Sequence, residues 1–484
     1  MAASIANKAM DIAFAIVMLR ELGPTDAGRF TWAVLIVGYF NILINFGLGI
    51  LITREVARDP QAGDRFLGAA LAARFSLWLA SLGLALALAG PLAGPLELTP
   101  AMGLTLVLLV LGVGLSEMAG LLSALFNARE RMEFPAGVTV FTTAVKVSLG
   151  TAALLLGYGI VGLAVASIIT NVLTATVLIA LAIRVLGPAR PVLDLGLGFH
   201  LAREAYPLML NNLLAGVFFR VDGVLLRATW GDTALGWYGA AYKVVDGLNV
   251  IPSGFVLALF PTFARAGVAD PQATSGNGTR AIPRPSLYRG TVMALRVLLA
   301  AAFPIAVGIT ILAEPIIGLF AGPKFLPHGA ITLQLLIWFI PFSFTNALLQ
   351  YVLIAANRQH TITVAFIIAS VFNIVGNLLT LPQWGYVAAA VMTVLSELVL
   401  LGPFLIAVHA HVGPLALLPI AWRPALGSAV MAPAVWAIAA ISPLLAVPVG
   451  VAVYVAALFV LRGATLAELN MLRDAWSRQP QPAA

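Results

Sequence analysis

The sequence predicts an all-α, polytopic membrane protein, and three observations lead to this fold class. Of its 484 residues, 61% are hydrophobic and only 10% are charged, with a mean hydropathy of +1.01. A soluble domain is about one-quarter charged, so this chain has too few charges to cover a surface that faces water. Apolar stretches of about 20 residues, the length a helix needs to cross a bilayer core, recur along the whole chain. The connections between them are too short to hold a soluble domain.

Fourteen membrane-spanning segments are predicted. They lie at about 2–19, 30–52, 67–90, 101–126, 135–157, 160–183, 205–228, 235–262, 288–312, 330–356, 361–381, 385–408, 424–441 and 444–461. The first spans only about 28 Å at 1.5 Å per residue, so we expect it to lack a turn or two at its inner end. Because Lys8 and Asp11 interrupt it, it does not resemble a cleaved signal peptide.

The distribution of basic residues predicts the orientation. Seventeen Lys and Arg fall in alternate connections and the C-terminal tail, and only four fall in the others, namely Arg20, Arg29, Arg227 and Lys324. By the positive-inside rule, both termini are cytoplasmic and the protein is a multi-pass protein of the inner (cytoplasmic) cell membrane. Since the charges are scattered over short connections, the net charge of +7 does not indicate nucleic-acid binding. The lack of cysteine excludes thiolate catalysis and thiolate metal sites.

An internal repeat indicates two related halves. Gly23-Pro-Thr-Asp-Ala-Gly28-Arg-Phe30 returns, 208 residues later, as Gly231-Asp-Thr-Ala-Leu-Gly236-Trp-Tyr238. A second match, at an offset of 226, pairs the segment from Tyr158 with the segment from Trp384. Six spans per repeat place both copies in the same sense, which predicts a pseudo-two-fold axis along the membrane normal and a central cavity. Such an arrangement is typical of a transporter and not of an enzyme.

The repeat also predicts the domain organisation. We expect an N-terminal six-helix lobe at 1–183, a cytoplasmic inter-lobe linker at 184–204 and a C-terminal six-helix lobe at 205–408. Two appended membrane helices at 409–462 and a cytoplasmic tail at 463–484 complete the chain.

Charged residues within the predicted spans mark a candidate site, because a charge at bilayer depth costs about 2.5–3.5 kcal/mol. At 1.5 Å per residue, three predicted spans place their charges at similar depths in the outer half of the membrane. These are Lys8 and Asp11 in the first span, Arg220 and Asp222 in the seventh, and Lys243 and Asp246 in the eighth. The eighth span also carries a polar stripe at helical spacing that we expect to line the cavity, formed by Tyr238, Tyr242, Asp246, Asn249 and Ser253.

Several longer segments resemble the polysaccharide-export branch of the multidrug/oligosaccharidyl-lipid/polysaccharide (MOP) flippase superfamily, the Wzx-like oligosaccharide flippases. They are LRELGPTDAGRF, NFGLGILITREVARD, RVDGVLLRATWGDTALGWYGAAYKVVDGL, LFPTFAR, EPIIGLFAGPKFLP and GYVAAAVMTVLSE, and the resemblance covers essentially the whole chain. It implies a two-lobe transporter that flips a polyprenyl-pyrophosphate-linked oligosaccharide from the cytoplasmic to the outer leaflet by alternating access. The partners it implies are this lipid, the bilayer and other polysaccharide-assembly membrane proteins.

With such a substrate, the membrane-embedded polar residues receive expected roles. Arg220 and Lys243 would attract the pyrophosphate through charge-assisted hydrogen bonds. The full expected substrate-binding set is Arg220, Lys243, Tyr242, Asn249, Asn41, Asn45, Lys8, Lys146 and Arg296. Acidic residues expected to couple transport to an ion, H+ or Na+, or to pair with charges are Asp246, Asp222, Asp11 and Glu397. No catalytic residue, resident metal or other cofactor is predicted.

A structural role competes with each of these assignments. Lys243 could pair with Asp246, and Lys8 with Asp11, because each pair is spaced i,i+3. The asparagines could join helices by hydrogen bonds. Arg296 and Arg74 could extend along their helices to the inner interface, and Glu117 has no assigned role.

Two other functions remain open. A cation-coupled multidrug exporter of the same superfamily would need an acidic, aromatic cavity, whereas the predicted spans hold six basic and five acidic residues. A membrane-embedded polysaccharide polymerase or glycosyltransferase would need a sizeable loop at one membrane face. The longest outer connection, about 313–329, is short and its only charges are Glu314 and Lys324.

Overall fold

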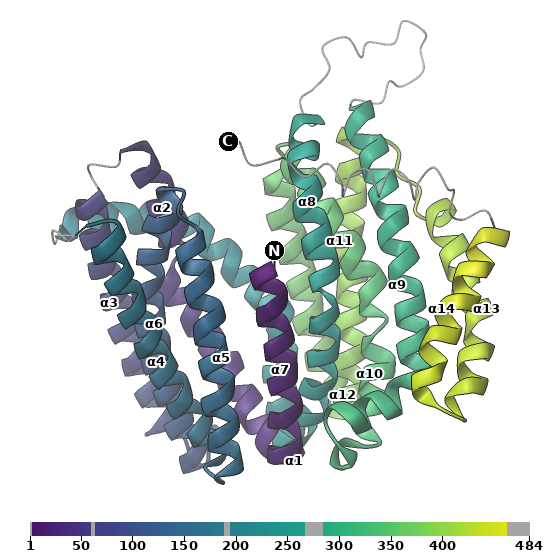
Figure 1. The fold of residues 1–484 in the computed structure, drawn as a ribbon, viewed down its shortest axis with the longest axis horizontal. Coiled ribbons are helices and arrows are strands. Elements are labelled where there is room, and N and C mark those ends of the chain that lie inside the picture. Colours follow the sequence, from purple (N-terminus) through teal and green to yellow (C-terminus); the bar gives the residue numbers. More distant parts are fainter. Residues whose placement is uncertain (1, 60–62, 188–193, 267–283, 462–484) are drawn as a thin grey trace, which may run out of the picture. The chain divides into compact units, whose positions relative to one another are not determined.

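The computed structural model describes residues 2–59, 63–187, 194–266 and 284–461, and these ranges contain helices and no β-strand (Figure 1). The predicted all-α class is confirmed. The α-helices are α1 (Ala2–Asn45), α2 (Leu48–Arg58), α3 (Gly63–Ala89), α4 (Pro100–Ala128), α5 (Glu133–Leu155), α6 (Gly159–Val185), α7 (Leu195–Leu248), α8 (Val250–Ala266), α9 (Pro285–Phe320), α10 (His328–Leu336), α11 (Phe339–Ala355), α12 (Gln359–His411), α13 (Leu418–Ala439) and α14 (Pro443–Val460). The predicted tail at 463–484 and part of the predicted inter-lobe linker, residues 188–193, lie outside the described residues, as do residues 267–283.

Nine helical runs of the described chain are long and apolar enough to cross a membrane, or ten if the bent pair α10–α11 forms one span. Three of these runs each cover two predicted spans, namely Ala6–Arg58, Gly196–Ala266 and Gln359–His411. A straight helix of 53 residues would be about 80 Å long, more than twice the roughly 30 Å of a bilayer core. Each run contains a break at a glycine, Gly23, Gly231 or Gly385, near the predicted loop. The count of fourteen spans remains a prediction.

The breaks adopt conformations that explain why the repeat contains glycine. Gly23 has φ 68° and ψ 179°, and Gly231 has φ 78° and ψ −175°. Side chains rarely tolerate this region of backbone space, so glycine is the residue that permits the break. The second sequence match behaves alike, since Gly159 and Gly385 have φ 54° and 51°. Gly23 and Gly231 thus share one local conformation, and both members of the second match have a positive φ.

The chain divides into two compact units. The first contains Met1–Gly247, Ile317–Thr332 and Phe366–Ser396, and in it α3, α4, α5 and α6 stand side by side. Its cores are built from interleaved aliphatic side chains, such as Leu121 and Leu125 of α4 packed with Ile52 of α2. The second contains Leu248–Ile316, Leu333–Ala365 and Glu397–Ala484. There α13 and α14 pack on α9 through Leu312, Met431 and Tyr454.

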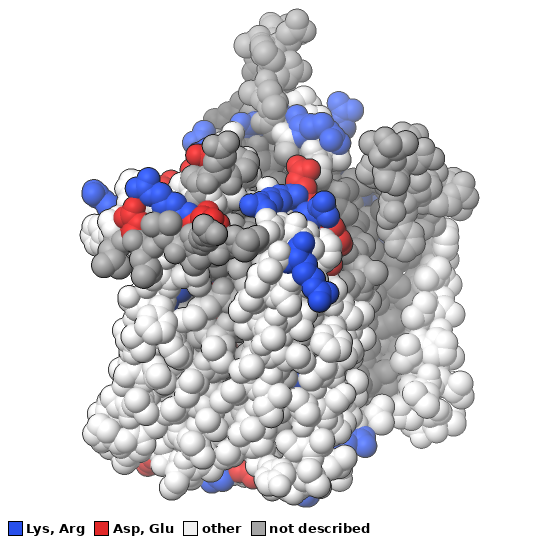
Figure 2. All heavy atoms as spheres, turned by 60° about the vertical axis from the view of Figure 1, so that its left-hand side comes forward, with Lys and Arg blue, Asp and Glu red and all other residues white. Residues whose placement is uncertain are grey.

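On the outer surface seen in Figure 2, charged residues avoid the middle of the helices. On the face shown in Figure 2, Lys, Arg, Asp and Glu gather at the two ends of the helices, and the surface between them is almost free of charge. Apolar side chains are exposed instead along the spans, for example Phe75, Leu79 and Leu86 on α3. This distribution is what a bilayer requires of a multi-pass membrane protein.

Candidate substrate-binding site

The first unit brings together five of the charges predicted at bilayer depth. Lys8 of α1 donates to Asp246 of α7, with Nζ and Oδ2 2.9 Å apart. Lys146 of α5 lies 3.4 Å from the Oδ1 atom of Asp11 of α1. Lys243 interacts electrostatically with all four of these residues. Of the three spans whose charges were predicted to reach the same level, the first and eighth supply this cluster, and its remaining residue comes from α5 instead of the seventh span.

The pairing differs from the i,i+3 alternative. Lys8 and Asp11 each bind a residue of another helix, so these ion pairs join α1 to α7 and α1 to α5. Lys243 lies within 4 Å of no carboxylate in the described chain. Three cations thus face two anions, which leaves one positive charge in excess. All five side chains are exposed to some degree, with 31% to 51% of the paired side chains accessible.

Arg220 forms a second cationic position on the other limb of α7. It is exposed, and its guanidinium group lies against Gly38 of α1, where any side chain would collide with it. Within the described residues it has no hydrogen-bonding or ion-pairing partner. Counted from the break at Gly231, Arg220 and Lys243 lie about 16 Å and 18 Å along their limbs, so the two cations occupy similar levels.

Asn41 and Asn45 do not face open space but bind a carboxylate. Asn41 and Asn45 donate to the Oε1 and Oε2 atoms of Glu117 of α4, at 2.9 Å and 2.6 Å. Arg74 of α3 also contacts Glu117, with Nη1 and Oε2 3.3 Å apart, and donates to its backbone carbonyl. This arrangement favours the interhelical role for both asparagines.

The predicted extension of Arg74 to the inner interface is wrong. Its side chain is only 2% exposed, because it turns inward to the Glu117 carboxylate. Glu117 therefore gains a structural role that its position in the sequence did not reveal.

Asp222 occupies a buried site of its own in the first unit. It is 2% exposed and accepts hydrogen bonds from the hydroxyl groups of Tyr238 of α7 and Thr393 of α12, the latter at 2.9 Å. The described chain places no Lys or Arg in an ion pair with it. Tyr242, the next residue of the predicted stripe, donates to the carbonyl of Phe219 at 3.3 Å.

Three further predicted residues lie in the second unit. Glu397 of α12 is 1% exposed and accepts a hydrogen bond of 2.6 Å from Asn346 of α11. Asn249 accepts one of 3.3 Å from Ser343, and Arg296 of α9 is exposed.

The comparisons with known proteins agree with this membrane architecture. The family model described as polysaccharide biosynthesis protein matches residues 1–266, more than half of the chain. The chain belongs to this family. The MatE family model matches residues 207–379. No curated protein sequence matches the chain.

Solved structures share the fold of this family member. One is the lipid II flippase MurJ in an inward closed conformation, with a TM-score of 0.77, 14% identity, and coverage of 95% of this chain and 97% of that one. Another is an inward-facing multidrug resistance MATE family transporter of the MOP superfamily, with a TM-score of 0.64, 13% identity, and coverage of 83% and 93%. A Vibrio cholerae MATE transporter has a TM-score of 0.55 at 15% identity, with coverage of 84% and 95%.

Together the family matches place the chain in the MOP superfamily as a multi-pass membrane transporter, and these families contain transporters, not enzymes. The matched range 1–266 includes the ion pairs of Lys8 and Lys146 and both unpaired cations, Arg220 and Lys243.

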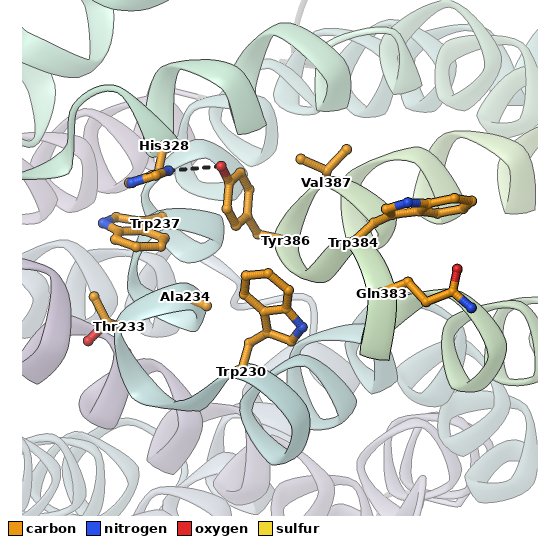
Figure 3. Close-up of a pocket in the computed structure, with 9 residues that line it drawn as sticks. All are labelled: Trp230, Thr233, Ala234, Trp237, His328, Gln383, Trp384, Tyr386 and Val387. Carbon is orange, nitrogen blue, oxygen red and sulfur yellow. Dashed lines mark hydrogen bonds between the residues drawn. The ribbon is translucent and has the colours of Figure 1, made fainter.

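The first unit also contains an aromatic pocket that the sequence did not predict (Figure 3). It has a volume of about 470 Å³ and is lined by Trp230, Thr233, Ala234, Trp237, His328, Gln383, Trp384, Tyr386 and Val387. The clustering of tryptophan around Gly231 and Gly385 was visible in the sequence. Only the folded structure shows that the two clusters meet, with His328 beside them.

Proposed function

We propose that this protein flips a polyprenyl-pyrophosphate-linked oligosaccharide from the cytoplasmic to the outer leaflet by alternating access, for export of a surface polysaccharide. The observation that carries the proposal is the presence of two exposed cations at bilayer depth, Arg220 and Lys243, without an ion-pair partner in the described chain. An uncompensated cation in a membrane span is costly unless its cavity admits water or an anion. A pyrophosphate supplies that anion and accepts several charge-assisted hydrogen bonds.

The ion pairs beside Lys243 suit reversible binding. A bound pyrophosphate competes with Asp246 for Lys8 and with Asp11 for Lys146, so both lysines can change partner without being left unpaired. This competition limits the net binding free energy of the substrate. A transporter needs such a limit because it must also release its substrate. Tyr242 and Asn249 are the polar groups that we assign to the sugars.

The acidic residues are candidates for ion coupling. Asp222 and Glu397 are buried carboxyl groups with hydroxyl or amide donors and no basic partner in the described chain, which suits binding of H+ or Na+. Asp246 and Asp11 form ion pairs with Lys8 and Lys146, so we assign to them the role of pairing with these lysines. We further propose that the protein resides in the cytoplasmic membrane with both termini inside, is built from lobes at 1–183 and 205–408, and works with other polysaccharide-assembly membrane proteins.

The test is to delete the gene and measure lipid-linked oligosaccharide separately in each leaflet. We expect accumulation on the cytoplasmic face and loss of surface polysaccharide, restored by the wild type. Arg220→Ala/Lys243→Ala should restore export at least roughly ten-fold less well, because each hydrogen bond to a charged group contributes about 1.5–3 kcal/mol. Arg58→Ala, an exposed arginine at the end of α2, is the matched control and should restore export fully.

The MatE match favours a multidrug exporter as the second candidate. An unchanged lipid-linked pool, combined with greater sensitivity of the deletion strain to cationic drugs, would reject the flippase and support the exporter.

A further inference from the structure

A second binding site is indicated by the aromatic pocket of the first unit, which lies on a different helix face from the cations. Its α7 residues Thr233, Ala234 and Trp237 lie on one side of the limb that follows the break at Gly231, and Trp230 lies directly before the break. Tyr238, Tyr242 and Asp246 follow another face of the same limb. The pocket is therefore separate from the proposed pyrophosphate site. It lies beside the breaks at Gly231 and Gly385, on the side that the distribution of Lys and Arg predicts as outer.

The walls of this pocket are held in place by contacts among its own side chains. The Nδ1 atom of His328 and the hydroxyl of Tyr386 are hydrogen-bonded at 2.8 Å. The His328 ring stacks on Trp237, with ring centroids 4.0 Å apart and planes at 30° (Figure 3). Trp230 donates to the carbonyl of Leu381 at 2.8 Å and lies over Gly385, where any side chain would collide with its ring. Trp and Tyr are common at membrane–water interfaces, where their rings lie at the level of the lipid headgroups. Here residues from α7, α10 and α12 support one another around a cavity.

The lining indicates the chemistry of the ligand. It includes no Asp, Glu, Lys or Arg, so nothing there compensates a charged group. Trp384 and Trp230 are 59% and 43% exposed and offer open aromatic faces. Gln383 is exposed and its amide forms no hydrogen bond within the described chain. A sugar ring matches this combination, because its C–H face packs on an indole and its hydroxyl groups bond to an amide. A volume of about 470 Å³ is in the usual range for small-molecule sites.

We propose that this pocket binds an uncharged saccharide unit at the predicted outer face. The inference rests on the proposed function in one respect, since the transporter itself would deliver saccharide to that side. Trp384 supplies the stacking face and Gln383 the hydrogen bonds, while His328, Tyr386 and Trp237 position the walls. A phospholipid headgroup fits less well, because its phosphate would meet no cation.

The test uses the purified full-length protein in lipid nanodiscs. The probe is the oligosaccharide released by mild acid from the lipid-linked pool of the deletion strain, and saturation-transfer NMR measures its binding. We expect transfer to the sugar protons with the wild type. Trp384→Ala and Gln383→Ala should each weaken binding about five- to ten-fold, the size expected for one aromatic contact or hydrogen bond. Trp436→Ala is the matched control, because this tryptophan of α13 is 73% exposed and lies outside the pocket.

The outcomes separate this inference from the proposed function. Equal binding by wild type and Trp384→Ala, or no transfer to any sugar proton, would overturn the saccharide site, as would displacement of the saccharide by glycerophosphocholine. The proposed function depends instead on accumulation in the inner leaflet, which is measured without this pocket. If lipid-linked oligosaccharide accumulates in the inner leaflet but the purified protein binds no saccharide, only the saccharide site is rejected. If the protein binds the saccharide but no lipid-linked oligosaccharide accumulates, only the flippase function is rejected.

Discussion

Individual charged residues of the first unit have two different roles, which burial distinguishes. Lys243 and Arg220 are exposed, whereas the side chain of Arg74 is 2% exposed and that of Glu117 14%. Loss of one member of a buried ion pair strands its partner, at a cost of about 3–5 kcal/mol. We therefore expect Glu117→Gln to lower the thermal stability of the purified protein strongly. Glu55→Gln is the control, since Glu55 pairs at a helix end with exposed Arg54 and Arg58, and such pairs contribute about 0–1 kcal/mol.

A second variant shows whether the buried pair has a purpose beyond stability. Replacing both members with apolar residues of similar size, Arg74→Met/Glu117→Met, removes the stranded charge and should recover part of the stability lost in Glu117→Gln. The recovery is partial because Asn41 and Asn45 lose their acceptor in this variant. Melting curves followed by intrinsic fluorescence provide the comparison. If the single variant melts like the wild type, the pair does not stabilise the bundle as its burial indicates.

For the charged residues of the first unit, the sequence predicted their depth in the membrane but not their partners. The depth of Lys8, Asp11, Lys243 and Asp246 followed from counting along helices, and the structure brings them together. Their partners did not follow, because spacing of i,i+3 identifies neighbours on one helix but not the residues that a second helix presents. Glu117 binds Asn41 and Asn45 only because α1 and α4 pack together. No property of the α4 sequence alone indicates that contact.

At the scale of helices, the start of α7 offers a pH-dependent test. The Oδ1 atom of Asp194 accepts the backbone N–H of Leu197 at 2.8 Å, and its Oδ2 atom lies 2.8 Å from Arg65 of α3. The hydrogen bond at the helix N-terminus and the neighbouring arginine lower the pKa of Asp194 below its ordinary value of 3.8. A lowered pKa in the folded state means that this carboxylate stabilises the fold above the ordinary pKa. That contribution is lost as the pH falls through the lowered value.

Asp194→Ala should accordingly melt at a lower temperature than the wild type at pH 6. The difference should narrow as the pH falls below about 4, because the wild type then loses the same interaction. Parallel melting curves at pH 6, 5, 4 and 3 measure this trend. If the difference in melting temperature between wild type and Asp194→Ala stays constant over this pH range, the carboxylate charge does not stabilise the start of α7.

Helix breaks were more predictable than helix ends. Two glycine pairs, Gly23/Gly231 at the offset of 208 and Gly159/Gly385 at the offset of 226, have positive φ, so the sequence match and the conformation coincide there. The bend of 40° between α10 and α11 went unpredicted, because the stretch from 330 to 356 was treated as one apolar span. Pro341 cannot donate to the carbonyl of Ile337, four residues earlier, and the helix breaks at 337–338. Hydropathy reports that a segment is apolar, not that its backbone continues straight.

At the scale of the whole molecule, the repeat creates a contact between its own two copies. A side chain at Gly28 would meet the backbone of Asp232, and one at Gly236 would meet the backbone of Pro24. Pro24 and Asp232 are themselves separated by 208 residues. Thr25 and Thr233, again 208 apart, share a hydrogen bond of 2.9 Å between their hydroxyl groups. The contact is thus reciprocal, as a pseudo-two-fold axis requires, and only glycine permits so close an approach of the two backbones.

An alternating-access transporter that opens on this side must separate these two breaks, which gives the whole-molecule prediction. The chain contains no cysteine, so Thr25→Cys/Thr233→Cys introduces the only thiols, at two positions whose hydroxyl oxygens lie 2.9 Å apart. We expect oxidation to join the two breaks and stop the proposed flipping of lipid-linked oligosaccharide to the outer leaflet, and dithiothreitol to restore it. The two single variants control for the substitutions, and maleimide labelling measures how far the disulfide has formed. Full delivery with the disulfide complete would mean that transport proceeds while the repeat-related breaks stay in contact. The path of the substrate would then have to open elsewhere between the helices.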